Sequence, residues 1–202
     1  MQISEFTFRR ARAEDAVEPI AHYIYDTDGY IYPCVARDWR DTLWLNLIRT
    51  CFHTPGDVFC WEHLYVAERN GQILALACVL PGGADLTFAR RFMQSESMAE
   101  GLETAVKGYF QPLIEENKLL SGYNIANFCV DSACRGLGLG SAFMAWLVSE
   151  LGDKDIWLDV ILANSSAIRL YEKAGFRKVA EYSGFSGSEE VLPCMHMLRK
   201  HN

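Results

Sequence analysis

The chain has 202 residues, of which 50% are hydrophobic and 22% charged, and its mean hydropathy is near zero. This composition predicts a folded domain with an ample apolar core rather than a disordered chain. The net charge of −7 argues against non-specific nucleic-acid binding, which depends on clustered lysines and arginines. The apolar run over 73–80 is far shorter than the roughly 20 residues that cross a bilayer, and no leader pattern is visible at the N-terminus. We therefore expect a cytoplasmic chain without a membrane or nucleic-acid partner.

The cysteines are odd in number and form no Cys-x-x-Cys pair. Most of them stand beside apolar or aromatic residues, as small buried thiols do in a reducing compartment. Without paired ligand spacing, we predict no metal site.

The N-terminal half is predicted to begin with an alternating strand at Phe6–Arg10, followed by a helix whose apolar positions run through 16–24. A second helix is predicted over Trp39–Cys51. The runs Leu64–Glu68 and Ile73–Leu80 predict a hairpin, because the Asn-Gly pair between them favours a type I′ turn.

Helical spacing then continues over about 84–120, and the chain is interpreted as a single domain spanning 1–202. Strands are predicted at Tyr123–Val130 and Ile156–Leu162, with helices following at Ser141–Leu151 and Ser165–Ala174. A final strand pair is predicted at Arg177–Tyr182 and Val191–Leu198. This order predicts an α/β fold with a mixed sheet, antiparallel in its N-terminal part and containing a parallel βαβ unit in its C-terminal part.

Three glycines alternate in the segment Arg135-Gly-Leu-Gly-Leu-Gly-Ser141, between a predicted strand and a predicted helix. Glycines at a helix start let a pyrophosphate approach free backbone N–H groups, and Arg135 adds a positive charge. A tight turn that binds nothing is the alternative. A dinucleotide fingerprint fails, because the required third glycine would fall on Ser141 or Phe143. No P-loop pattern is present.

At these residues the sequence resembles the GNAT N-acetyltransferase superfamily. The acetyl-CoA loop of that family follows the pattern Q/R-x-x-G-x-G/A. Arg135, Gly138 and Gly140 match its three fixed positions. A second family pattern, N-x-x-A-x-x-x-Y-x-x-x-G-F, matches Asn164, Ala167, Tyr171, Gly175 and Phe176. The resemblance covers about Tyr123–Tyr182 and implies a centrally splayed sheet flanked by helices. The segment 84–120 is longer than the resemblance leads us to expect between these strands, so we interpret it as a helical insertion.

The resemblance also implies acetyl-CoA as co-substrate, with its pantetheine along the backbone at Cys129 and Val130 and its pyrophosphate on the loop amides. The cofactor-binding residues implied in this way are Cys129, Val130, Arg135, Gly136, Leu137, Gly138, Leu139, Gly140, Ser141, Asn164, Ala167 and Tyr171. Asn164 is also expected to cap the helix that follows it.

The implied reaction is direct transfer of an acetyl group to a primary amine, in a small molecule or a peptide N-terminus. Tyr171 is the family's usual general acid, and simple packing is its alternative role. Asp159 occupies the strand position at which one branch of the family has its general base. The alternative is a polar residue that is merely hydrogen-bonded within the sheet. Many relatives use a chain of water molecules instead of a side-chain base. His53, His63 and His196 have no motif context and receive no role.

The acceptor is expected near the predicted N-terminal helices and the loop over 25–32. Asp26 and Asp28 there suit a cationic amine, although an ordinary polar turn is the favoured interpretation. A different class of function is a GNAT-fold module that binds acyl-CoA and regulates without turnover. A homodimer is left open.

Overall fold

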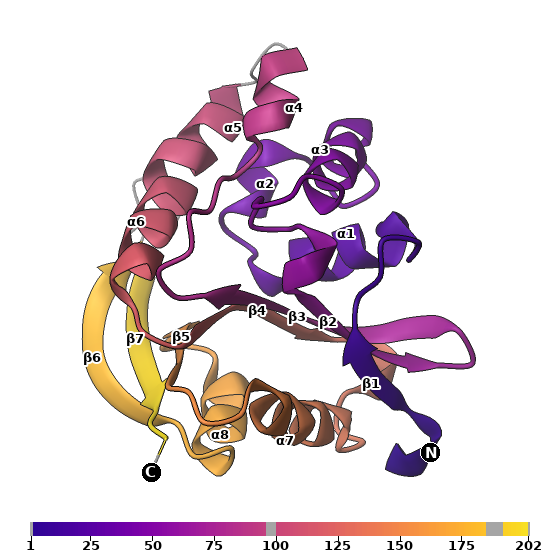
Figure 1. The fold of residues 1–202 in the computed structure, drawn as a ribbon, viewed down its shortest axis with the longest axis vertical. Helices are drawn as coiled ribbons and strands as arrows, with labels where there is room; N and C mark the ends of the chain where they lie inside the picture. The colour runs from indigo at the N-terminus through magenta and orange to yellow at the C-terminus, as the bar shows by residue number, and fades with distance from the viewer. Residues whose placement is uncertain (1, 96–99, 185–191, 202) are drawn as a thin grey trace.

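The described residues of this computed structural model, 2–95, 100–184 and 192–201, form one seven-stranded sheet in the order β1-β2-β3-β4-β5-β7-β6 (Figure 1). The strands are β1 (Thr7–Arg10), β2 (Leu64–Arg69), β3 (Gln72–Pro81), β4 (Tyr123–Val130), β5 (Ile156–Ile161), β6 (Arg177–Gly184) and β7 (Leu192–Arg199). Only β4 and β5 are parallel; every other neighbouring pair is antiparallel. The predicted mixed α/β sheet is confirmed.

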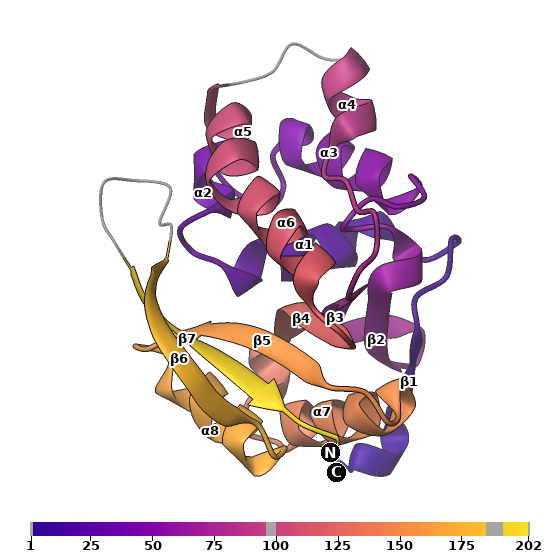
Figure 2. The ribbon, with the colours of Figure 1, turned by 60° about the vertical axis from the view of Figure 1, so that its left-hand side comes forward.

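Helices cover both faces of the sheet, and they divide along the sequence (Figures 1 and 2). One face carries the helices that precede β4: α1 (Val17–Thr27), α2 (Tyr32–Val35), α3 (Thr42–Phe52), α4 (Arg90–Ser95), α5 (Glu100–Ala105) and α6 (Gln111–Leu119). The other face carries α7 (Leu139–Leu151) and α8 (Ser165–Lys173). A π-helical turn, Val106–Phe110, joins α5 to α6, and short 3₁₀ turns lie at Ile3–Glu5, Trp61–His63 and Ser132–Cys134.

The sheet separates two hydrophobic cores. The core on the α1–α6 side is rich in aromatic rings, and its fully buried Trp44 donates an indole N–H to the carbonyl oxygen of Ala21 at 2.9 Å. The core on the other side joins α7 and α8 to the sheet through residues such as Phe143 and Phe176. Burial of apolar surface on both faces fixes the positions of β4 and β5 between the two layers.

The predicted hairpin is confirmed, with Asn70 and Gly71 both at positive φ between β2 and β3. The final strand pair is confirmed too, and β7 lies between β5 and β6; Val191, at its predicted start, lies outside the described residues. The second helix begins at Thr42, later than predicted, because the Asp41 carboxylate caps it by accepting from Leu43 N–H at 2.9 Å.

The prediction of helix from residue 84 onward is wrong at its start. Thr87 instead forms backbone hydrogen bonds with Val58 and Gly56, both at 2.8 Å. The buried Asp57 carboxylate accepts from the N–H of Ala89 at 2.8 Å. These hydrogen bonds hold the stretch before α4 in a non-helical conformation. Desolvation raises the pKa of Asp57 to about 6, against the opposing effect of its hydrogen bonds.

Candidate active site

The two central strands pair only near their starts. Backbone pairing joins Tyr123–Ile125 of β4 to Ile156–Leu158 of β5 and stops there. Each strand continues beyond this point with its other neighbour, β4 with β3 as far as Val130 and β5 with β7 as far as Ile161. The facing edges of β4 and β5 therefore separate and lack a strand partner, as the predicted central splay requires.

A β-bulge in β4 marks the separation. Val79 of β3 pairs with Ile125 and Cys78 pairs with Asn127, so Ala126 is the extra residue. Bulges bend a strand and redirect its side chains, which explains why β4 leaves β5 at this position.

The glycine loop begins α7 two residues earlier than predicted. Gly136 and Gly138 have φ of +75° and +86°, and Gly138 is the N-cap of a helix that starts at Leu139. The first intrahelical bond runs from Ala142 N–H to the Gly138 carbonyl oxygen at 3.0 Å. The N–H groups of the first turn therefore have no partner within the helix and are available to an anion.

Gly140 has a packing role in the same turn. A Cβ atom at this position would lie 3.0 Å from a methyl carbon of Leu170 and 3.4 Å from one of Val130. Its missing side chain lets the start of α7 approach both α8 and the end of β4.

Arg135 links the loop to β4. Its Nε donates to the carbonyl oxygen of Val130 at 3.0 Å, and the residue is otherwise exposed. The guanidinium is therefore oriented beside the helix start, where its charge adds to that of the helix dipole.

Asn164 caps α8, as predicted. Its Oδ1 accepts from the N–H of Ala167 at 3.1 Å and from the hydroxyl of Ser166 at 3.0 Å. The cap fixes the direction of the helix that carries Tyr171.

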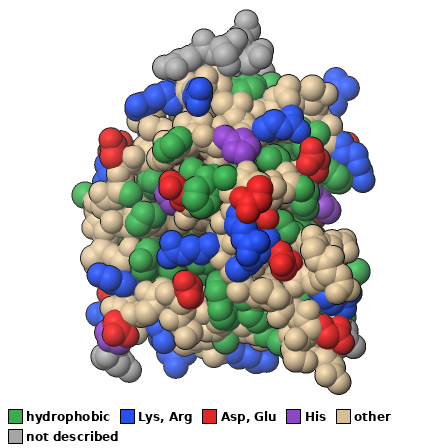
Figure 3. Space-filling model, turned by 45° about the vertical axis from the view of Figure 1, so that its right-hand side comes forward, with side chains coloured by type: hydrophobic (Ala, Val, Ile, Leu, Met, Phe, Trp, Pro, Cys, Tyr) green, Lys and Arg blue, Asp and Glu red, His purple; other side chains and the backbone are tan. Residues whose placement is uncertain are grey.

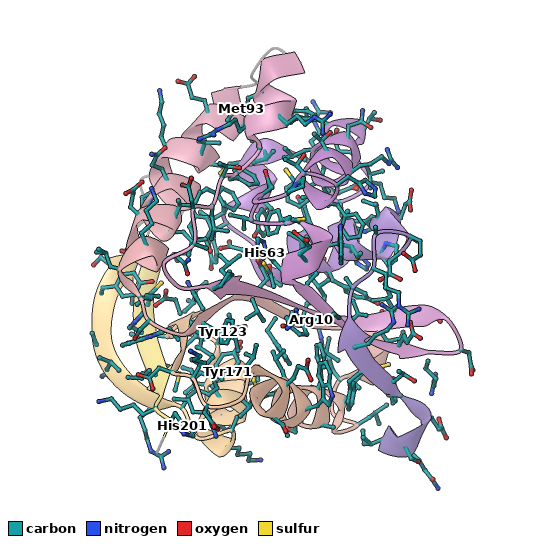
Figure 4. All side chains as sticks on the ribbon, in the orientation of Figure 1. Arg10, His63, Met93, Tyr123, Tyr171 and His201 are labelled. Carbon is teal, nitrogen blue, oxygen red and sulfur yellow. The ribbon has the colours of Figure 1, made fainter. Side chains whose placement is uncertain are left out.

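Tyr171 lies beneath the central strands, with only 8% of its surface exposed (Figure 4). Its ring is edge-on to that of Phe128 at 6.4 Å and tilted against Phe176 at 6.0 Å. The structure records no hydrogen bond from its hydroxyl to another described residue. Burial raises the pKa of the phenol, so the hydroxyl keeps its proton at neutral pH.

A cavity of about 710 Å³ runs between the separated strands, from the glycine loop to residues of α1 and the π-helical turn. The lining includes most of the residues implied as cofactor-binding: Cys129, Val130, Arg135, Gly136, Gly138, Gly140, Ser141, Asn164, Ala167 and Tyr171, together with Asp159. Leu137 and Leu139 do not line it. Leu139 is fully buried in the α7–α8 core, so only its main chain could face a ligand there.

Two cysteines line the cavity near the glycine loop, and Cys129 is a poor nucleophile. Cys129 is 5% exposed and belongs to the core on the α1–α6 side, and burial raises the pKa of its thiol to about 11. Cys134 is buried on the opposite side of the sheet. A thiol with a raised pKa carries little thiolate at neutral pH.

Asp159 is paired with a histidine that the sequence did not reveal. His196 of β7 stands directly opposite in the register, and its Nδ1 lies 2.7 Å from Asp159 Oδ1. The hydrogen bond to Asp159 is the largest cause of the raised pKa of His196. Trp157 stacks on the imidazole at 4.9 Å between ring centroids and holds it in place.

The end of the cavity farthest from the glycine loop contains Asp28, Tyr109, Asn127 and Tyr182 as well as Asp159. Asp28 both lines the cavity and forms the polar turn expected of it, since its Oδ1 accepts from the N–H groups of Tyr30 and Ile31. Tyr109 and Tyr182 carry no sequence signal, because they come from the π-helical turn and an edge strand rather than from a motif.

Among the described residues, no cluster of His, Cys, Asp and Glu could hold a metal ion. No described helix is both long and apolar enough to cross a membrane. Figure 3 shows acidic and basic side chains interspersed over the face that it views.

Solved structures share this fold. An N-acetyltransferase from Staphylococcus aureus Mu50 superposes with a TM-score of 0.70 at 18% identity, over 95% of this chain and 99% of that one. The ribosomal-protein-S18-alanine N-acetyltransferase from Escherichia coli gives 0.55 at 18% identity, over 98% and 94% of the two chains. The chain therefore shares the fold of these two structures.

A family model described as the acetyltransferase (GNAT) family matches residues 36–176. The chain belongs to the GNAT acetyltransferase family, and the prediction of an acyltransferase enzyme is confirmed. Members of this family use an acyl-CoA co-substrate. A search of curated proteins finds no significant match.

Proposed function

We propose that this protein transfers an acetyl group from acetyl-CoA directly to a primary amine of a small molecule or a peptide N-terminus. The observation that carries the proposal is one continuous cavity that joins a glycine-rich helix start to a group of carboxylates across the gap between β4 and β5. We further propose that 1–202 acts as one catalytic domain, in which the segment 84–120 is an insertion.

The residues present fit an acyl-CoA. The first-turn N–H groups of α7 and the Arg135 guanidinium suit its phosphates, and the unpaired edge of β4 suits the amides of its pantetheine arm. When bound, the co-substrate supplies a thioester whose carbonyl carbon is open to attack by an amine.

Tyr171 is proposed to donate its phenolic proton to the departing sulfur. Its hydroxyl faces the cavity, has no hydrogen-bond partner among the described residues, and is kept protonated by burial. Free tyrosine and thiol pKa values of about 10 and 8.5 already make this transfer uphill, and the burial that raises the pKa of Tyr171 makes it more so. Hydrogen bonding to the developing charge is therefore part of the role.

The acceptor amine must lose a proton before it can attack, because an alkylammonium with pKa of about 10.4 has no free electron pair. Asp159 lines the cavity and is hydrogen-bonded to His196, so the pair can receive that proton directly or through a water molecule. The carboxylates Asp26 and Asp28 support a cationic acceptor.

The test is a CoA-release assay with acetyl-CoA and a panel of polyamines, amino acids, aminoglycosides and N-terminal peptides. We expect CoA release that depends on an amine, with an acetylated amine found by mass spectrometry. Tight binding of acetyl-CoA without acetylation of any amine would favour a regulatory module instead.

A further inference from the structure

Three aspartates line the cavity, and they differ in whether a histidine lies beside the carboxylate. Asp26 pairs with His22 at 3.3 Å, and Asp159 pairs with His196 at 2.7 Å. Asp28, which lines the same cavity, forms no ion pair with any residue that the structure describes. Among these three carboxylates, Asp28 is therefore the one that has no histidine beside it.

Asp28 also has one carboxylate oxygen that is not used in a hydrogen bond with the described residues. Its Oδ1 accepts from the N–H groups of Tyr30 at 2.7 Å and Ile31 at 2.9 Å, whereas its Oδ2 has no hydrogen-bond partner in the described part of the chain. Burial raises the pKa of this carboxyl. Arg135 is the one basic residue among the described residues of the lining, and it lies at the glycine-loop end. A bound cation would supply a counter-charge.

Asn127 presents a second unused acceptor. The residue is 5% exposed, and its Nδ2 donates to Thr27 Oγ1 at 2.6 Å and to the Tyr32 hydroxyl at 2.9 Å. Both amide hydrogens are thereby used, and Oδ1 accepts from no residue that the structure describes. An amide oxygen without a partner, on a residue that lines the cavity, points to a hydrogen-bond donor in the ligand.

Tyr109 lines the same cavity and is the third member of this group. It projects from the π-helical turn Val106–Phe110, and such turns occur frequently at functional sites. Phe110 anchors the turn by stacking on Phe88, with ring centroids 3.5 Å apart. Burial raises the pKa of the Tyr109 phenol, and the negative charges of Asp28 and Asp159 raise it further, so its hydroxyl lies in the field of both carboxylates and stays protonated.

We propose that the acceptor is a diamine, or a primary amine with a second cationic nitrogen, whose distal ammonium group is held by Asp28, Asn127 and Tyr109. An ammonium group has three N–H donors, which match the carboxylate, amide and hydroxyl oxygens. The reacting amine then lies beside Asp159, whose own charge is paired with His196. This inference rests on the proposed function and specifies its substrate class.

The test compares α,ω-diamines with amino alcohols of equal chain length, which keep one amine and replace the other by a hydroxyl. With acetyl-CoA present, we expect kcat/KM for the preferred diamine to exceed that of its matched amino alcohol at least tenfold. Asp28→Asn should lower this ratio about tenfold, and Tyr109→Phe about threefold. Asparagine keeps an oxygen for the Tyr30 and Ile31 N–H groups, so the turn should still fold.

Asp38→Asn is the control, because Asp38 is exposed and outside the cavity; the ratio should not change. Equal kcat/KM for diamines and amino alcohols, or a ratio unaffected by Asp28→Asn, overturns the inference while amine acetylation still stands. If no amine is acetylated, the proposed function fails, and calorimetry with the diamine alone decides the inference. Binding that Asp28→Asn weakens about tenfold supports it; absent binding, or equal binding of the amino alcohol, overturns it.

Discussion

The two ends of the cavity offer a ligand opposite chemistry. At the glycine-loop end, the groups available are main-chain N–H donors at the start of α7 and the guanidinium of Arg135. At the other end they are side-chain oxygens, including the carboxylates of Asp28 and Asp159. An anionic group is therefore favoured at one end and a cationic group at the other, which orients the two substrates of an acyl transfer toward each other across the β4–β5 gap.

The ends also differ in how a substitution can alter them. The loop end depends on backbone shape, so it is sensitive where a glycine has positive φ or where a Cβ atom would meet a neighbour, as at Gly138 and Gly140. The carboxylate end depends on side chains from the C-terminal end of α1, the π-helical turn, β4, β5 and β6. Its specificity can change by single side-chain replacements that leave the loop intact.

The largest expected effect concerns Tyr171, which lines the cavity and is proposed to act as the general acid. Tyr171→Phe keeps the ring and its packing against Phe128 and Phe176 but removes the hydroxyl. We expect kcat to fall by about 10²-fold or more, with little change in calorimetric affinity for acetyl-CoA.

Tyr65→Phe is the matched control, because Tyr65 is also buried in the α7–α8 core but lies outside the cavity. It should turn over normally. Normal turnover of Tyr171→Phe as well would leave Tyr171 with a packing role only.

A second substitution isolates the loop end. Gly138→Asp places a negative side chain at the N-cap of α7, where the phosphates of the co-substrate are proposed to lie. We expect the dissociation constant for acetyl-CoA to rise at least tenfold, or about 1.4 kcal/mol. Gly71→Asp introduces the same residue at a similar positive φ in the β2–β3 turn, where nothing lies within 4 Å, and so controls for backbone strain. Equal affinity in a folded Gly138→Asp protein would contradict the phosphate assignment.

The carboxylate end should respond to pH through His196. The hydrogen bond to Asp159 raises the pKa of His196 above 6.5, with a further contribution from the charge of Glu116. If the pair accepts the amine proton, kcat/KM should rise about fivefold from pH 6 to 8, and His196→Gln should shift or remove this limb. The contribution of the pair to stability is fully present below pH 6.5 and is lost as pH rises through the folded pKa. An identical pH profile in His196→Gln would exclude His196 from proton transfer.

The smallest effect separates two roles of Asn164. Asn164→Ala removes the N-cap of α8 and should lower the free energy of unfolding by about 1 kcal/mol, measured by urea titration. Asn164→Ser retains a capping oxygen and should restore most of that stability. If the side chain also contacts acetyl-CoA, affinity should remain about threefold weaker in Asn164→Ser; full recovery of affinity would assign the residue to capping alone.

The loop end could be predicted from sequence because its determinants are local. The glycines at 136, 138 and 140 and the cap at Asn164 each act on neighbouring residues, so their spacing carries their geometry. The error of two residues in the start of α7 arose because Gly138 itself caps the helix, which placed Gly140 inside the first turn.

The carboxylate end could not be predicted in the same way, because its residues meet only through tertiary structure. His196 reaches Asp159 across the β5–β7 register, although the two residues are 37 positions apart in the chain. Tyr109 reaches the cavity through a π-helical turn, which breaks the helical spacing that sequence patterns follow. The sequence did suggest Asp28 as a partner for a cationic amine. It could not show that Asp28, unlike Asp26 and Asp159, has no histidine beside it.

The most direct test of this account is a two-substrate initial-rate measurement with acetyl-CoA and the preferred amine, combined with intact-mass analysis of the protein after incubation with acetyl-CoA alone. Direct transfer within a cavity that holds both substrates predicts intersecting double-reciprocal lines and no acetylated protein. Parallel lines, with a stoichiometric acetyl group trapped on Cys129 or Cys134, would contradict it.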